Sequence, residues 1–173
     1  MLRLYSQTQF SFRTTRALSR FLHTTPRSTL ETVLHHIELT QTMYHEPRLL
    51  AFRIFKHRAD LAFYSACEDL AVWCRALRVL HVELRVGDWP VHMEVGERWS
   101  WPLLVFEEVG NRVQWARVRL SVPGWKGDRL EGVEREVEKR VMGDEAFRAR
   151  EVEWERVARE GRVRAGKVLR VVF

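Results

Sequence analysis

Residues 50–86 place the strongest constraint on the fold. Apolar residues alternate with other residues at 50–56 and again at 80–86, a pattern typical of half-buried strands. Between these runs, apolar residues recur at steps of three and four, which predicts a helix with one apolar stripe. The stripe consists of Phe63, Cys67, Leu70, Cys74 and Leu77. A strand, a helix and a strand predict a right-handed crossover, so these two strands should be parallel neighbours.

Further elements are expected after residue 86. Alternating or apolar runs predict strands at 91–95, 103–109 and 116–122. Helical stripes follow at 128–141 and from Asp144 onward, and an apolar strand is expected at 168–173. This order indicates an α+β protein with a ferredoxin-like split β-α-β arrangement in two layers, carrying an N-terminal helix and an extra C-terminal helix.

The first 30 residues contain five arginines, no acidic residue and many serines and threonines. This composition is typical of a mitochondrial transit peptide, and a disordered basic tail is the alternative. We therefore expect a transit peptide at 1–29, an N-terminal helix at 30–47 and a single α+β domain at 48–173 with a basic C-terminal end, located in the mitochondrial matrix. Without the leader, 24 basic residues face 23 acidic ones, so the excess of positive charge lies mainly in the leader.

The sequence contains no recognisable catalytic motif, and no catalytic residue, cofactor or metal site is predicted from it. The histidines lack the spacing of a metal site, and no apolar run is long enough to cross a membrane. Cys67 and Cys74 lie on the predicted buried stripe and are expected to be reduced core residues. A non-enzymatic role is favoured.

Two groups of basic and aromatic residues are candidate contact sites for RNA or a protein partner. The first group lies in loops and on the predicted strand at 116–122, where tryptophans accompany cations; RNA stacking, a protein interface and simple packing all remain open for it. It comprises Arg98, Trp99, Trp101, Arg117, Arg119 and Lys126. The second is the basic end, with Arg156, Arg159, Arg162, Arg164 and Lys167. It is expected to contact an acidic partner, with RNA as the leading candidate. The alternative is that its arginines pair with Glu151, Glu153 and Glu155.

Four segments resemble the ribosomal protein S ten family and its mitochondrial relatives. FRIFKHRADLAFYSACEDLAVWC matches the family's first strand and helix, and ERWSW at 97–101 resembles its E-R-W-T-V-like strand. Residues 113–122 and 128–141 correspond to its third strand and following helix. The resemblance implies a ferredoxin-like component of the mitochondrial ribosome or translation apparatus, whose partners are mitochondrial ribosomal RNA, proteins of a large complex, or both. A small matrix enzyme, a ligand-binding module and an assembly factor of another mitochondrial complex are the alternatives.

Overall fold

Strands and helices alternate along the chain in the computed structural model, which describes residues 8–43, 50–87, 93–110, 113–125, 127–160 and 169–172. The strands are β1 (Thr8–Phe12), β2 (His36–Met43), β3 (Val79–Val86), β4 (Trp115–Ser121) and β5 (Leu169–Val172). The helices are α2 (Thr15–Thr24), α3 (Arg27–Val33), α4 (Leu50–Trp73), α5 (Trp101–Glu108), α6 (Gly127–Met142) and α7 (Asp144–Glu160).

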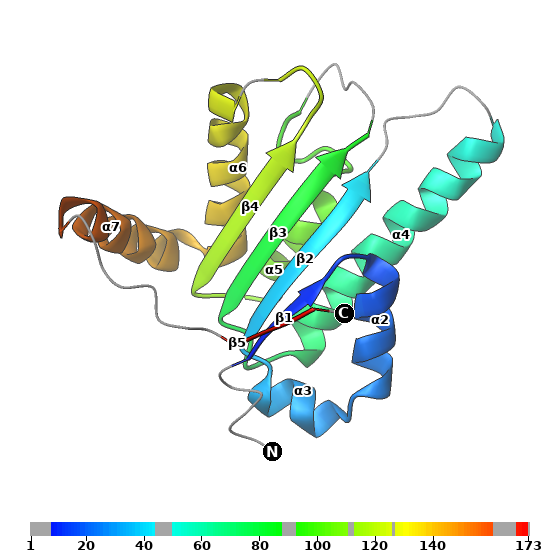
Figure 1. Cartoon of the computed structure of the whole chain (residues 1–173), viewed down its shortest axis with the longest axis horizontal. Helices are drawn as coiled ribbons and strands as arrows, with labels where there is room; N and C mark the ends of the chain where they lie inside the picture. Colours follow the sequence, from blue (N-terminus) through cyan, green and yellow to red (C-terminus); the bar gives the residue numbers. More distant parts are fainter. Residues whose placement is uncertain are drawn as a thin grey trace.

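The five strands form one sheet in the order β4-β3-β2-β1-β5, and every described pair is parallel. Parallel neighbours need a crossover connection, and at least one helix lies between each strand and the next. Helices α2, α4, α5 and α6 pack side by side in that order, which follows the order of strands β1 to β4. Figure 1 shows α5 behind the sheet, with α6 to its left and α4 to its right. The fold is therefore a parallel sheet with a layer of helices on one face.

The core lies between the sheet and this helix layer. The strand register brings buried apolar side chains into rows across the sheet. One row contains Phe10, Ile37, Leu80 and Ala116, and the next contains Phe12, Leu39, Val82 and Val118. The helices contribute buried apolar side chains from their inner faces, including Leu18, Leu22, Phe63, Leu70, Leu103 and Val137.

Local sequence explains why α2 follows β1 directly. The Thr14 side chain accepts a hydrogen bond from the amide of Ala17 and caps the first turn. The ring of Phe21 then lies 5.3 Å from Phe10 and 5.2 Å from Phe12, measured between ring centroids. Polar capping at one end and aromatic packing along one side therefore fix the helix against the strand that precedes it.

The mixed α and β content and several elements predicted from the sequence are confirmed. Strands β3 and β4, helices α6 and α7, and the final strand lie at or near the expected residues. The ferredoxin-like arrangement is not confirmed, because the sheets of that fold are usually antiparallel and every described strand pair here is parallel.

Three predicted elements are wrong. Residues 50–56 are the first turns of α4 rather than a strand, because the helix that carries the buried stripe from Phe63 onward extends back to Leu50 without a break, with exposed side chains at 53–55. The predicted helix at 30–47 holds only the end of α3, and residues 36–43 instead form β2. Residues 103–109 belong to α5 and its end rather than to a strand. Of the predicted strand at 91–95, residues 91 and 92 lie outside the described part, and 93–95 are not in a strand.

Residues 8–29 are part of the domain. Strand β1 pairs with both β2 and β5, and Phe10, Phe12, Leu18 and Leu22 are buried in the core. Cleavage near residue 30 would remove an inner strand and α2. An import signal within residues 1–29 stays a prediction about location, and residues 1–7 lie outside the described part. Within that part, no helix has the length and apolar character needed to span a membrane.

Candidate partner-binding surface

One face of the sheet is polar. Parallel sheets are usually covered on both faces, but side chains opposite the helix layer are mostly half-buried or exposed. Figure 1 views the sheet from this side. The register places these side chains in four rows. They are Gln9–His36–Val79–Trp115, Ser11–Glu38–His81–Arg117, Thr40–Glu83–Arg119 and Thr42–Arg85–Ser121. We call this surface the polar sheet face.

Two histidines pack together near the middle of the polar sheet face. The rings of His36 and His81 lie 5.1 Å apart at an angle of 82°, and the Nε2 atom of each is buried without a hydrogen-bond partner. Burial lowers the pKa of His36, and burial together with the nearby His36 lowers the pKa of His81 to about 4. Both rings are therefore neutral at pH 7. They leave the arginines and carboxylates around them to set the charge of the face.

The carboxylates and arginines of the polar sheet face are interleaved. Gln9 donates a hydrogen bond of 2.7 Å to Glu38, and the guanidinium of Arg85 donates one of 2.9 Å to Glu83. In the register Glu83 is paired with Arg119, one strand further along. The surface thus offers donors and acceptors side by side rather than a single sign of charge.

A pair of tryptophans and an arginine form one border of this face, which we call the aromatic rim: Trp115, Arg117 and Trp154. The rings of Trp115 and Trp154 stack 6.1 Å apart at 19°, and the Arg117 guanidinium lies 5.6 Å from the Trp154 ring. About half of Trp154 is exposed. A groove of about 420 Å³ runs past this rim along β4, between α6 and α7.

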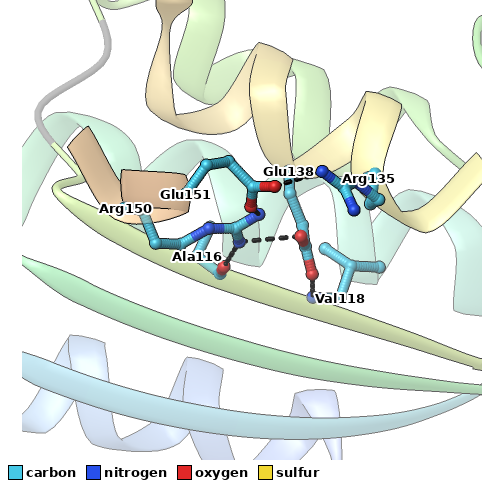
Figure 2. A network of polar contacts seen from close by, with 6 residues as sticks. All are labelled: Ala116, Val118, Arg135, Glu138, Arg150 and Glu151. Carbon is cyan, nitrogen blue, oxygen red and sulfur yellow. Dashed lines mark hydrogen bonds and ion pairs between the residues drawn. The ribbon is translucent and has the colours of Figure 1, made fainter. Parts of the chain in front are cut away.

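A buried ion pair holds α7 where it can form this rim, as Figure 2 shows. Arg150 of α7 donates a hydrogen bond of 2.7 Å to Glu138 of α6 and one of 2.5 Å to the carbonyl of Ala116 in β4. Glu138 in turn accepts a 2.8 Å hydrogen bond from the amide of Val118. Gly143, with φ of 79°, ends α6 and lets the chain turn directly into α7. The position of Trp154 therefore depends on Arg150, one turn earlier in the same helix.

These contacts also protect an edge of the sheet. Strand β4 is at the edge, and its outward-facing amides would otherwise be free to pair with another chain. The amide of Val118 donates to Glu138, and the amide of Leu120 donates a hydrogen bond of 2.6 Å to Glu134. Side chains of α6 and α7 thus take the place of a neighbouring strand along β4.

The residues predicted as contact sites fall into separate places. Arg117 and Arg119 lie together on the polar sheet face. Arg98, Trp99 and Trp101 lie just before or at the start of α5; Trp99 is only 8% exposed, whereas Arg98 and Trp101 are exposed. Arg98 and Trp101 line cavities with residues of α4 rather than of the sheet.

The basic end is described only in part. Arg156 forms hydrogen bonds of 2.6 and 2.9 Å with Glu153, the intrachain pairing that was one of the alternatives. Lys126, Arg162, Arg164 and Lys167 and the side chain of Arg159 lie outside the described residues.

Neither cysteine has the environment of a reactive thiol. Cys67 and Cys74 are free and buried, and burial raises the pKa of both thiols, that of Cys74 to about 12. A nucleophilic cysteine needs the opposite shift. Within the described residues there is also no group of three side chains suited to a metal ion.

No family model matches the chain, and no match was found among curated proteins or solved structures. The resemblance to the S ten family stays a prediction, and any functional conclusion must come from the geometry. The sequence indicated the position of Arg117 and Arg119 beside a tryptophan. It did not indicate His36, Glu38, Trp154 or the Glu138–Arg150 pair, although the alternation of Ile37, Leu39 and Met43 in β2 would have placed the first two on one sheet face.

Proposed function

We propose that this protein is a non-enzymatic binding module whose polar sheet face and aromatic rim bind a polypeptide segment of another protein. The observation that carries the proposal is the polar face of a parallel sheet, opposite the helix layer. Its rows present closely spaced donors and acceptors over four strands. Tryptophan and arginine at one border are the residue types that most often dominate the energy of protein interfaces.

The charge pattern favours protein over RNA. Glu38 and Glu83 lie in the same rows as Arg117 and Arg119, so a phosphate backbone following the arginines would approach carboxylates as well. Single-stranded nucleic acid is usually bound by a groove of one sign of charge combined with stacking aromatic rings. A polypeptide carries both hydrogen-bond donors and acceptors and suits the interleaved face better. A place in a large complex of the mitochondrial matrix is the cellular setting predicted from the sequence, and it forms part of this proposal.

The test compares two substitutions of the same kind. Arg119 lies on the polar sheet face and Arg148 on α7, and both are exposed. The tagged wild-type protein, Arg119→Glu and Arg148→Glu would be purified from cells with their associated proteins, which are then quantified by mass spectrometry. We expect at least one protein whose recovery falls about tenfold or more in Arg119→Glu and is unchanged in Arg148→Glu, since charge reversal at an interface costs more than about 1.4 kcal/mol.

Ribonuclease treatment separates the two kinds of partner. Recovery that survives ribonuclease supports direct protein binding, whereas recovery lost on treatment would assign the face to RNA. Equal recovery with both variants would show that the polar sheet face is not the interface. Thermal unfolding of each variant checks that it is folded.

A further inference from the structure

A second surface, separate from the polar sheet face, lies on the first half of α4. Among the described side chains of this helix, which start at Arg53, the first buried one is that of Phe63, and those from 53 to 62 are half-buried or exposed. Three large apolar residues are among them: Ile54 is 51% exposed, Phe55 64% and Leu61 60%. Such residues are costly to leave in water, and clustered ones often mark a contact site.

Ile54 and Leu61 border a groove between α4 and the start of α5. Two cavities of about 310 and 120 Å³ adjoin each other and share His57, Asp60 and Arg98 in their walls. Ile54 lines the first cavity, and Leu61 and Trp101 line the second. We call this site the α4–α5 groove.

Trp101 is held in place as an anchor in this groove. Its indole Nε1 donates a hydrogen bond of 2.6 Å to the carbonyl of Gly96, although 49% of the residue is exposed. The buried Ser100 hydroxyl accepts a 2.9 Å hydrogen bond from the Gly96 amide and donates one of 2.9 Å to the carbonyl of Glu97. Gly96 has φ of 99°, which a residue with a side chain rarely adopts. An anchor fixed before binding loses little conformational entropy when a partner arrives.

The charges around the groove are mostly positive. Among the described residues that line the two cavities, Asp60 is the one acidic residue, and it is in an ion pair with Lys56. Arg58 and Arg98, which also line these cavities, are exposed. The groove therefore combines apolar walls with a surplus of cations, a surface complementary to apolar residues flanked by carboxylates.

We propose that the α4–α5 groove binds an amphipathic α-helix of a partner protein, with an apolar ridge flanked by Asp or Glu. Ile54 and Leu61 are seven residues apart, two helical turns or roughly 10 Å, which an i, i+3, i+7 ridge on a partner helix can match. The concave shape distinguishes this partner from an anionic membrane. A ridge of side chains fills a groove, whereas a bilayer surface is contacted best by residues that protrude.

The test uses the full chain and a fluorescent synthetic peptide of about 18 residues, long enough to be helical. The peptide carries a leucine ridge and flanking glutamates, and a scrambled peptide of the same composition lacks the ridge. Anisotropy is expected to show binding of the first peptide only. Leu61→Ser and Arg98→Glu should each weaken it about fivefold or more. Val152→Ser and Arg148→Glu are the matched controls on α7, where Val152 is 66% exposed, and should leave it unchanged.

Three results would overturn the proposal. The first is absence of binding, and the second is equal binding of the two peptides. The third is a loss in the α7 controls as large as in the groove variants. Vesicles of phosphatidylcholine with phosphatidylserine are tested in parallel. Vesicle binding that depends on Leu61 and Arg98, without binding of the peptide, would assign the surface to a membrane instead.

Discussion

Replacing Arg150 by methionine is expected to lower the free energy of unfolding by about 3–5 kcal/mol, although Arg150 lies on a helix at the border of the structure. Its side chain is only 5% exposed and that of Glu138 only 9%. Methionine keeps most of the volume but leaves the Glu138 carboxylate buried without its cation. The carbonyl of Ala116 also loses a hydrogen bond, which alone costs about 1–3 kcal/mol.

The double variant tests the cause of this loss. Glu138→Gln removes the buried charge but keeps an oxygen that can accept the hydrogen bond from the Val118 amide. In the Arg150→Met background this change should therefore cost little, or restore stability. The stability lost in the double variant should be smaller than the sum of the losses in the two single variants, by about 2 kcal/mol or more. The reason is that the two substituted residues share one interaction.

Urea unfolding followed by circular dichroism measures these free energies. Arg135→Met is the matched control. Arg135 also forms an ion pair, with Glu151, but its side chain is 51% exposed. Its loss should stay below about 1 kcal/mol, as for other surface ion pairs. A loss for Arg150→Met no larger than that for Arg135→Met would refute the reasoning. In that case the Glu138–Arg150 contact would be replaceable by solvent.

Cys67→Ala should lower stability by about 1 kcal/mol with binding in proportion to the folded fraction, and complete loss of binding in a stably folded Cys67→Ser would point to thiol chemistry. The pKa of His81 is lower in the folded protein than in the unfolded chain. The free energy of unfolding should therefore fall as the pH drops from 6.5 toward 4, by at most about 1.4 kcal/mol per pH unit. His81→Gln should remove this part of the slope, and an identical slope in both proteins would contradict the assignment. Deletion of residues 1–29 should abolish cooperative unfolding because it removes β1, and a stable truncated protein would show that β1 is dispensable. Replacing Arg159, Arg162 and Arg164 by Gln should reduce any salt dependence of RNA binding. An unchanged salt dependence would show that these arginines do not contact RNA phosphates.

Local periodicity predicted the elements whose pattern is long and consistent. In β3 and β4 every second residue is apolar, and in α6 apolar residues recur at helical spacing. Moving the boundary of such an element by one residue does not change whether it is assigned as a strand or a helix. Residues 50–56 show the limit of this approach. Seven residues with three apolar alternations fit a strand, but they also fit an exposed helical extension, and Ile54 and Phe55 are in fact both exposed.

Composition did not indicate that residues 8–29 contribute a strand and a helix to the domain. The arginines lie on the surface, with Arg13 just before α2 and Arg16 and Arg20 on its exposed side. They carry no information about Phe10 and Phe12, whose alternation was the signal for β1. The pairing of β1 with β2 and β5 joins residues far apart in the sequence, so no local pattern could specify this strand order.

The candidate surfaces depend on how whole helices and strands pack against one another. The alternation of Trp115, Arg117 and Arg119 could place them on one face, but not show that the face lies opposite the helices. Trp154 reaches Trp115 only because Arg150 fixes the angle of α7 against β4. Likewise, the exposure of Leu61 and Trp101 beside each other follows from the packing of α4 on α5.

The positions of the two proposed surfaces make their tests independent. The polar sheet face is opposite the helix layer, whereas the α4–α5 groove lies within that layer, so the sheet separates them. A partner filling the groove would not cover the histidine pair or the aromatic rim, and loss of binding at one surface should leave binding at the other intact. If both proposals hold, one chain could join two partners across a single rigid sheet. A variant pair such as Arg119→Glu and Leu61→Ser would then release different proteins, whereas release of the same protein by both would require a partner long enough to wrap around an edge of the sheet.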